Sequence, residues 1–106
     1  MLSSKTFRFD YPNSLSYRLH IQNGTQLNWE CLAGDDKGRT GTETYQMSQV
    51  GEQQYFLSWL EQDDIAVAEL LDLNACKVYA QILIPTSLMG AEHAEQLHFV
   101  GDVTVL

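Results

Sequence analysis

Three side chains of this sequence combine acid–base or hydrogen-bonding chemistry with apolar surroundings: Tyr11, Arg39 and Glu61. Glu61 ends an apolar stretch, residues 54–61, and side chains along a strand alternate between two faces. Glu61 is therefore expected to share a face with Tyr55, Leu57 and Trp59. A carboxylate in line with large hydrophobic side chains is costly when it is buried and unpaired. We thus expect Glu61 either at a rim in contact with water or as a placed functional group.

Arg39 follows Gly38 at the expected start of a strand whose face continues through Gly41, Glu43 and Tyr45. Arg39 is either a solvated surface group or a residue at a barrel mouth. At a mouth, its planar guanidinium could clamp a ligand carboxylate or hold Glu61. Glu61 is accordingly a general acid, if burial raises its pKa, or the salt-bridge partner of Arg39. The residues alone favour the rim salt bridge.

Four aromatic side chains at strand spacing are expected in the interior: Tyr17, Trp29, Tyr55 and Trp59. Ordinary core packing is one interpretation of this set. The alternative is a pocket wall for a flat, hydrophobic ligand. Ala66 and Ala68 would place small side chains on one face of the next strand, which would leave room beside the large ones.

Composition predicts one folded domain over residues 1–106, since 44% of the residues are hydrophobic. The net charge of −8 argues against nucleic acid or an anionic membrane as a partner, because both need clustered basic residues. The N-terminus lacks the apolar core of a signal peptide, and no apolar run is long enough to cross a membrane as a helix. Cys31 and Cys76 are expected as reduced thiols, and the expected compartment is the cytoplasm.

Motifs for cofactor and metal chemistry are not apparent in the sequence. The three histidines, His20, His93 and His98, show no metal-ligand spacing with cysteines or carboxylates. The sequence has no glycine-rich phosphate loop and no nucleophile elbow. We therefore expect no metal and no cofactor, and find no support for a hydrolase, kinase or dehydrogenase.

Period-two patterning runs through nearly the whole chain and predicts strands at 5–10, 15–21, 25–32, 39–47, 53–60, 65–73, 77–84 and 96–105. Many short antiparallel strands with short turns favour an all-β, closed up-and-down barrel of about eight strands. Such a barrel either fills with side chains or keeps a cavity for one small ligand. The main alternative is a two-sheet sandwich. Residues 85–95 break the pattern and are expected to form a long loop or a helical turn capped by Thr86 or Ser87.

The first hairpin allows a prediction of register. A three-residue loop at 22–24 would pair Ile21 with Thr25, Leu19 with Leu27 and Tyr17 with Trp29. Gly24 would then take the left-handed position of a bulged turn. A two-residue loop would place the apolar side chains of the two strands on opposite faces of the hairpin, so we favour the three-residue loop.

Segments at 17–21, 26–34, 43–45, 56–61, 71–74 and 78–79 resemble the molybdenum cofactor biosynthesis protein F-like (MoaF-like) family. The most specific part is the Ser58-Trp59-Leu60-Glu61 element with its spacing to Gly38-Arg39. The likeness covers most of the chain and implies a calycin-like, lipocalin-type β-barrel. The residues themselves show neither a basic cluster for a pterin phosphate nor a thiolate pair, so no link to the molybdenum cofactor follows from them.

The same layout is similar to the phenolic acid decarboxylases, which are dimeric barrels that need no cofactor. This resemblance implies that Tyr11 and Arg39 hold the substrate carboxylate and that Glu61 is the proton donor. Phe9 stands where that family has a second tyrosine, and a phenyl ring cannot donate a hydrogen bond.

The leading hypothesis is a barrel that binds a small aromatic or heteroaromatic ligand, with Arg39 orienting an acidic end of it. The expected ligand-binding residues are Tyr17, Trp29, Arg39, Tyr55, Trp59 and Glu61. One alternative is a cofactor-independent decarboxylase of phenolic acids with Tyr11, Arg39 and Glu61 as its catalytic residues. Another is a non-catalytic homodimer or partner-binding module whose outer face carries Phe56, Leu60 and Val67.

Overall fold

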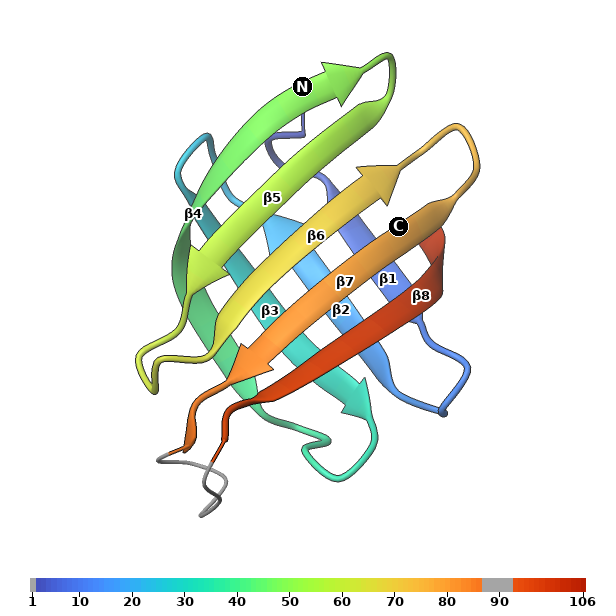
Figure 1. The fold of residues 1–106 in the computed structure, drawn as a ribbon. Helices are drawn as coiled ribbons and strands as arrows, with labels where there is room; N and C mark the ends of the chain where they lie inside the picture. The colour runs from blue at the N-terminus through green and yellow to red at the C-terminus, as the bar shows by residue number, and fades with distance from the viewer. Residues whose placement is uncertain (1, 87–92) are drawn as a thin grey trace.

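The computed structural model of the protein describes residues 2–86 and 93–106, which form eight β-strands (Figure 1). Their bounds are β1 Thr6–Asp10, β2 Ser16–Ile21, β3 Gln26–Ala33, β4 Thr40–Gly51, β5 Gln54–Leu60, β6 Ala66–Asp72, β7 Lys77–Ile84 and β8 Glu95–Val105. All eight predicted strands are present. The largest difference is in β4, which continues past its predicted end at residue 47 to Gly51. The predicted helical turn after Pro85 falls on residues 87–92, outside the described residues.

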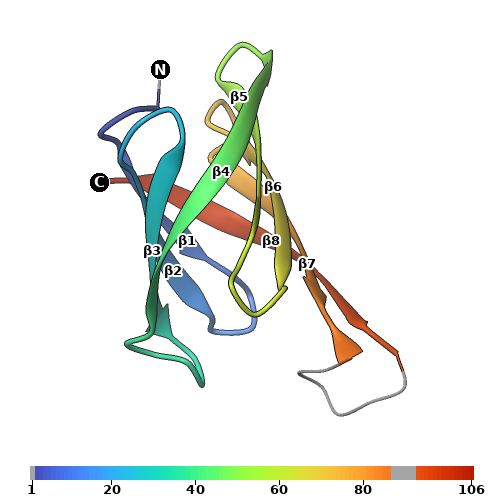
Figure 2. The same cartoon turned by 90° about the vertical axis from the view of Figure 1, so that its left-hand side faces the viewer.

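The strands form one closed ring. Each strand pairs antiparallel with the next along the chain, and β8 pairs with β1 to complete the barrel. At this seam Phe9 lies opposite Val103 and Phe7 opposite Val105. Figures 1 and 2 show the strands wrapping around a common interior. The up-and-down barrel is therefore confirmed, and the two-sheet sandwich is excluded. Closure satisfies the backbone groups that an open sheet would leave unpaired at its edges.

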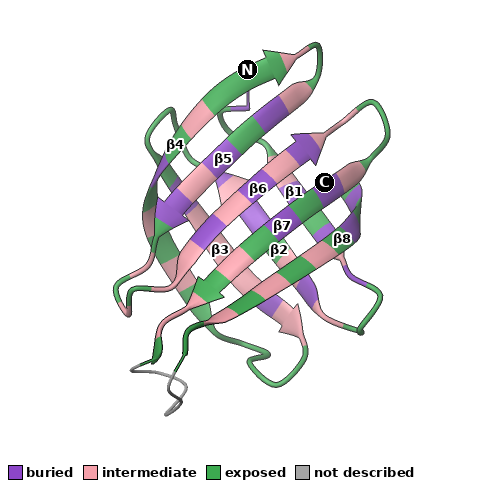
Figure 3. Cartoon of the chain, in the orientation of Figure 1, coloured by how far each residue is buried: buried purple, intermediate pink, exposed green. Residues whose placement is uncertain are grey.

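Alternation decides which side chains face the interior. In β5, Tyr55, Leu57 and Trp59 are buried, whereas Phe56 and Leu60 between and after them are exposed. In Figure 3, β6 alternates buried with intermediate residues, and β7 alternates more buried residues with mostly exposed ones. This alternation is the one from which Glu61 was predicted to continue the inward face of β5.

One end of the barrel is filled by apolar side chains. Seven of these are no more than 1% exposed: Leu2, Phe7, Ile21, Leu27, Leu57, Leu71 and Val78. They gather where the β2–β3, β4–β5 and β6–β7 turns lie, and we call this the closed end. Burial of one such side chain stabilises the fold by about 1.5–3 kcal/mol. The opposite end, where β1–β2, β3–β4 and β5–β6 are joined, is called the mouth.

The predicted register of the first hairpin is wrong by two residues. Ile21 pairs with Leu27 rather than with Thr25, and Leu19 pairs with Trp29 rather than with Leu27. Tyr17 likewise pairs with Cys31. Because side chains alternate with a period of two, an even shift keeps the same residues on the same faces. The apolar faces of β2 and β3 therefore still meet, as the sequence required.

The side chain of Asn23 explains this shift. Its Oδ1 accepts hydrogen bonds from the backbone N–H groups of Thr25 and Gln26, both at 2.9 Å. An asparagine that binds the backbone just after it forms a turn of its own, which widens the loop to residues 22–25. Gly24 does not adopt the positive φ that was predicted for it, since the glycines with positive φ among the described residues are Gly34 and Gly38.

β4 turns a corner of the barrel. Residues 40–44 pair with β3, and residues 45–51 pair with β5. Gly41 lies opposite Trp29, and a Cβ at Gly41 would overlap with the indole ring. The indole Nε1–H donates a hydrogen bond to Glu43 Oε2 at 2.8 Å. The ring is thus held against the backbone of β4, where only glycine leaves enough space.

We predict that Gly41→Ala destabilises the fold by about 1–3 kcal/mol, because the added methyl group must displace the Trp29 ring. The matched control is Gly24→Ala, since a Cβ at Gly24 has no atom within 4 Å. That control is expected to change stability by no more than about 0.5 kcal/mol. Urea unfolding followed by circular dichroism gives both values. Equal effects of the two substitutions would contradict the close packing of Trp29 on Gly41.

Candidate functional site

A cavity of about 300 Å³ lies inside the barrel at its mouth. Its lining residues come from seven strands or their ends, and from three loops. They are Phe9, Tyr11, Leu15, Tyr17, Leu19, Trp29, Asp35, Asp36, Arg39, Trp59, Glu61, Ile65, Val67, Glu69, Ala80, Ile82, Ile84, Leu97 and Phe99. On β1, β2 and β5, the next inward residue toward the closed end is a core residue: Phe7, Ile21 and Leu57, respectively. The core thus forms the floor of the cavity.

Glu61 lies at the mouth, directly after β5. Its carboxylate Oε2 accepts a hydrogen bond from the indole Nε1–H of Trp59 at 3.1 Å. The backbone N–H of Glu61 donates a hydrogen bond to the carbonyl of Ile65 at 2.8 Å, which closes the turn between β5 and β6. Burial raises the pKa of Glu61. The Trp59 hydrogen bond opposes this rise, and the negative charges of Glu43 and Asp63 add to it. Glu61 is therefore a half-buried acid that faces the cavity.

Arg39 also lines the cavity, but the ion pair it forms is with Asp36, at 3.7 Å between Nη1 and Oδ1. Gly38 adopts a φ of 94°, which favours glycine, and returns the chain from the β3–β4 loop to Arg39. The predicted rim salt bridge between Arg39 and Glu61 is not among the ion pairs of the described residues. Both side chains of the observed pair are more than half exposed, so it contributes little stability.

Tyr11 and Tyr17 line one side of the cavity. The backbone N–H of Tyr11 donates to the carbonyl of Leu15 at 2.9 Å, which fixes Tyr11 just after β1. Its ring packs against Phe99 with the centroids 5.5 Å apart. Burial raises the pKa of Tyr11, and the nearby charge of Glu69 adds to this effect. Burial also raises the pKa of Tyr17 to about 12. Both phenols therefore stay protonated at neutral pH and can donate a hydrogen bond.

Three of the four expected aromatic wall residues reach the cavity. Trp29 and Tyr17 meet edge to face with their ring centroids 6.2 Å apart, and Trp59 lines the cavity from β5. The exception is Tyr55, which is 6% exposed and packs in the core outside the cavity lining. Its place two residues further from the mouth than Leu57 explains this. Tyr55 supports the closed end of the barrel instead.

Glu69 is a functional candidate that the sequence reasoning missed. It lies on β6 between the inward residues Val67 and Leu71 and is 6% exposed. Its Oε2 is buried and has no hydrogen-bond partner among the described residues. Burial, with a further contribution from the charge of Glu61, raises the pKa of Glu69 to about 8. An unsatisfied buried polar group costs about 1–3 kcal/mol, which makes a purely structural role unfavourable.

The register of the β5–β6 hairpin shows how Glu69 could have been found. Trp59 pairs with Val67, so Val67 and Glu69 share the inward face of Trp59. The expected inward position of Ala66 and Ala68 is wrong, because they pair with the outward-facing Leu60 and Ser58. Val67 is 8% exposed and is therefore not part of the outer face on which it was expected. A register test at this turn, like that for the first hairpin, would have placed all of these residues.

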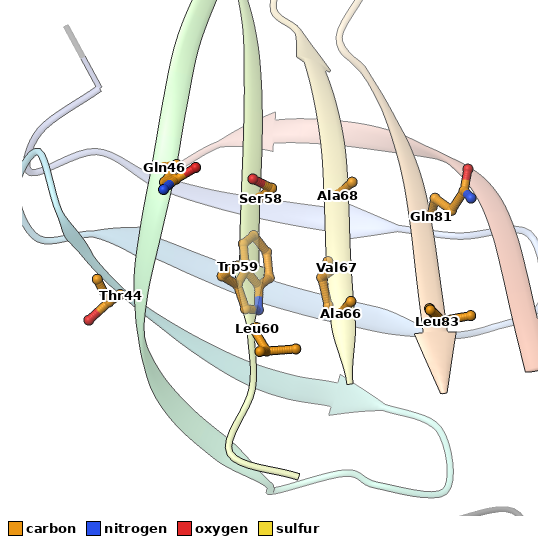
Figure 4. A pocket seen from close by; sticks show the side chains of 10 residues that line it. All are labelled: Thr44, Gln46, Ser58, Trp59, Leu60, Ala66, Val67, Ala68, Gln81 and Leu83. Atoms are coloured by element: carbon orange, nitrogen blue, oxygen red, sulfur yellow. The ribbon is translucent and has the colours of Figure 1, made fainter. Parts of the chain in front are cut away.

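A second hollow, of about 570 Å³, lies over the outer face of β4–β7. Figure 4 shows Gln46, Ser58, Ala68 and Gln81 in a row across these four strands. None of the residues that line the hollow can titrate at physiological pH. The cavity inside the barrel, by contrast, gathers Tyr11, Tyr17, Arg39, Glu61 and Glu69, and it is therefore the better candidate for a functional site.

Two further findings concern the described residues. Among residues 2–86 and 93–106, no group of three or more His, Cys, Asp or Glu side chains is placed to hold a metal ion. The same part of the chain contains no helix with the length and apolar character needed to cross a bilayer.

The closed strand order and the cavity at one end define an eight-stranded up-and-down β-barrel whose cavity contains acidic groups. Residues 3–96 match the MoaF-like family model, and the chain belongs to this family. The chain is also 30% identical over 82 residues to a probable phenolic acid decarboxylase of Vibrio cholerae serotype O1. That match covers 76% of this chain and 47% of the relative, so the chain spans about half the length of that protein.

A solved structure shows the same fold. It is a crystal structure from Burkholderia vietnamiensis, of a protein provisionally described as a beta-lactamase. The TM-score is 0.85 with 21% sequence identity, over 99% of this chain and 95% of that one. Likeness at this level of identity concerns the fold alone.

The raised pKa of Glu69 predicts a pH dependence of stability. Its ordinary pKa is 4.5, and that in the folded protein is about 8, so the folded state binds more protons between these values. The contribution of Glu69 to the free energy of unfolding is therefore greatest below pH 4.5. It is lost as the pH rises toward 8, by on the order of 5 kcal/mol in total. We expect Glu69→Gln to remove most of this loss.

Urea unfolding at pH 5 and at pH 8 measures the effect. The informative quantity is the difference between wild type and Glu69→Gln, because other carboxylates contribute equally to both. Glu52→Gln, in the exposed turn before β5, is the matched control and should keep the wild-type dependence. Identical pH dependence in wild type and Glu69→Gln would contradict a protonated Glu69.

Proposed function

We propose that the protein binds a small aromatic or heteroaromatic molecule in the cavity at the barrel mouth. The observation that supports this most directly is the cavity itself, about 300 Å³ in volume, with apolar walls and a few polar groups. Small-molecule sites have this character, and a volume at the lower end of their range suits a ligand of one or two rings. Trp29, Trp59 and Tyr17 provide flat surfaces against which such a ring can pack.

Arg39 is the group proposed to face an acidic end of the ligand. It is the basic residue in the cavity lining, and it lies at the mouth, where a carboxylate can remain partly hydrated. Its exposed pairing with Asp36 at 3.7 Å is weak enough to be exchanged for a ligand carboxylate. Glu61 lies at the same mouth and is proposed to limit how many negative groups the site accepts.

Native mass spectrometry of protein purified from its host tests the proposal. We expect a species heavier than the 12.0 kDa chain that loses a small molecule on denaturation. The same spectrum counts the subunits. A homodimer remains a prediction, for which Phe56 and Leu60 on the outer face, 43% and 62% exposed, offer apolar surface. Chains that carry no small molecule and also bind no aromatic probe in solution would remove the proposed function.

A matched pair of substitutions tests whether the ligand binds inside the barrel. Ala80 faces the cavity from β7, and Ala68 faces outward from β6. Ala80→Leu is expected to fill the cavity and weaken binding of a probe such as trans-cinnamate by about tenfold or more, whereas Ala68→Leu should leave it within about threefold. Isothermal titration calorimetry measures both. Equal loss in the two variants, or none in Ala80→Leu, would place binding outside the barrel.

The second candidate function is cofactor-independent decarboxylation of phenolic acids. The similarity to the Vibrio cholerae protein favours it, together with the presence of Tyr11, Arg39 and Glu61 around one cavity. Tyr11 and Arg39 would hold the carboxylate. Glu61 would donate its proton to the adjacent vinyl carbon, and the quinone-methide-like intermediate would release CO2 as the phenolic ring is restored. The raised pKa of Glu61 supports the protonated form that this step needs.

Ultraviolet spectroscopy tests this activity with p-coumarate and ferulate. A decarboxylase of this type replaces the substrate band with that of the vinylphenol, and Glu61→Gln should slow the reaction by about 100-fold or more. Glu52→Gln serves again as the control, because Glu52 lies in a turn at the closed end. An unchanged spectrum at high protein concentration would exclude these substrates and leave ligand binding as the function.

A further inference from the structure

Glu69 lies at the floor of the cavity without a partner. It projects inward from β6, its exposed fraction is 6%, and its Oε2 has no hydrogen bond within the described part of the chain. Ala80 lies opposite it on β7, and Tyr11 is near enough for the charge of Glu69 to raise its pKa. A leucine would pack in this environment, because Val67 and Leu71 flank Glu69 on the same face. A carboxyl group at this position does not stabilise the fold, and its role is better explained by contact with a ligand.

The groups that face Glu69 include no cation. Tyr11 just after β1 and Tyr17 of β2 present neutral phenols, and Glu61 just after β5 is another carboxyl group. Arg39 stands at the mouth, where it pairs with Asp36. In total the lining holds four acidic residues and one basic residue, namely Asp35, Asp36, Glu61, Glu69 and Arg39. The described lining residues thus place no cation beside Glu69, and a bound molecule can supply one.

We propose that Glu69 recognises a basic nitrogen of the ligand at the floor of the cavity. This inference rests on the proposed function and specifies its ligand as an alkylamine that carries an aromatic ring, with any acidic group at the opposite end near Arg39. An ammonium group brings up to three N–H donors and a positive charge, which matches an acidic cavity. A hydroxyl group offers one donor and no charge. A ligand carboxylate at this depth would find no cation to pair with and would lie near the charge of Glu61.

The raised pKa of Glu69 agrees with this assignment. Without a cation nearby, the carboxyl group holds its proton because burial disfavours the charged form. An ammonium group within hydrogen-bonding distance would favour the carboxylate instead. Binding of an amine should therefore ionise Glu69, and binding of an alcohol should leave it protonated.

Three matched probes test the inference by isothermal titration calorimetry on the full chain: 2-phenylethylamine, 2-phenylethanol and phenylacetate. We expect wild type to bind the amine about tenfold or more tightly than the other two. Glu69→Gln and Glu69→Leu should lose that preference while binding the alcohol within about threefold of wild type. Glu52→Gln, with its side chain exposed at the closed end, should keep the preference.

The outcomes separate the two proposals. If phenylacetate or the alcohol binds most tightly, or if the amine preference survives in both Glu69 variants, the inference is overturned while ligand binding stands. If none of the three probes binds wild type, both are overturned for this class of ligand. Carbon-13 NMR of the wild-type Glu69 carboxyl group provides a readout that needs no variant. A chemical shift showing that the Glu69 carboxyl group stays protonated at pH 7 with the amine bound would also overturn the inference.

Discussion

The interior of a closed eight-stranded barrel must be filled by its own side chains or by something else, and this chain fills only one end of it. Leucine, isoleucine, valine and phenylalanine pack the closed end to near-complete burial. Toward the mouth, the inward positions carry Ala80, Tyr17, Trp29 and carboxyl groups, which leave space between them. Ring closure prevents the strands from moving inward to remove that space, because each is hydrogen-bonded to two neighbours. The cavity is thus a consequence of how bulky side chains are distributed along the strands.

Much of this arrangement could be predicted from alternation alone. The inward face of β5, with Glu61 as its continuation, was evident from residues 54–61, and eight strands with short turns led to the barrel. What alternation could not supply was register. In the first hairpin, a side-chain hydrogen bond of Asn23 to the backbone displaced the pairing by two residues. In the β5–β6 hairpin, reading Ala66 and Ala68 as inward concealed Glu69.

Interactions between charged side chains were the other part that the sequence could not determine. Arg39 and Glu61 are separated by 22 positions, and either could approach the other once both lie at the mouth. Asp36 is closer along the chain, on the same loop, and it is the residue that Arg39 contacts. Loop conformation, set in part by the positive φ of Gly38, decides between these partners. Glu61 consequently keeps a carboxylate that is held by Trp59 and is open to the cavity.

The chain contains two tryptophans, Trp29 and Trp59, and both line the cavity. Each indole donates its N–H to a carboxylate, Glu43 in one case and Glu61 in the other. Indole emission responds to charge and to hydration near the ring. The tryptophan fluorescence of this protein therefore originates from the wall of its cavity, and it serves as a built-in optical reporter for molecules that enter the barrel.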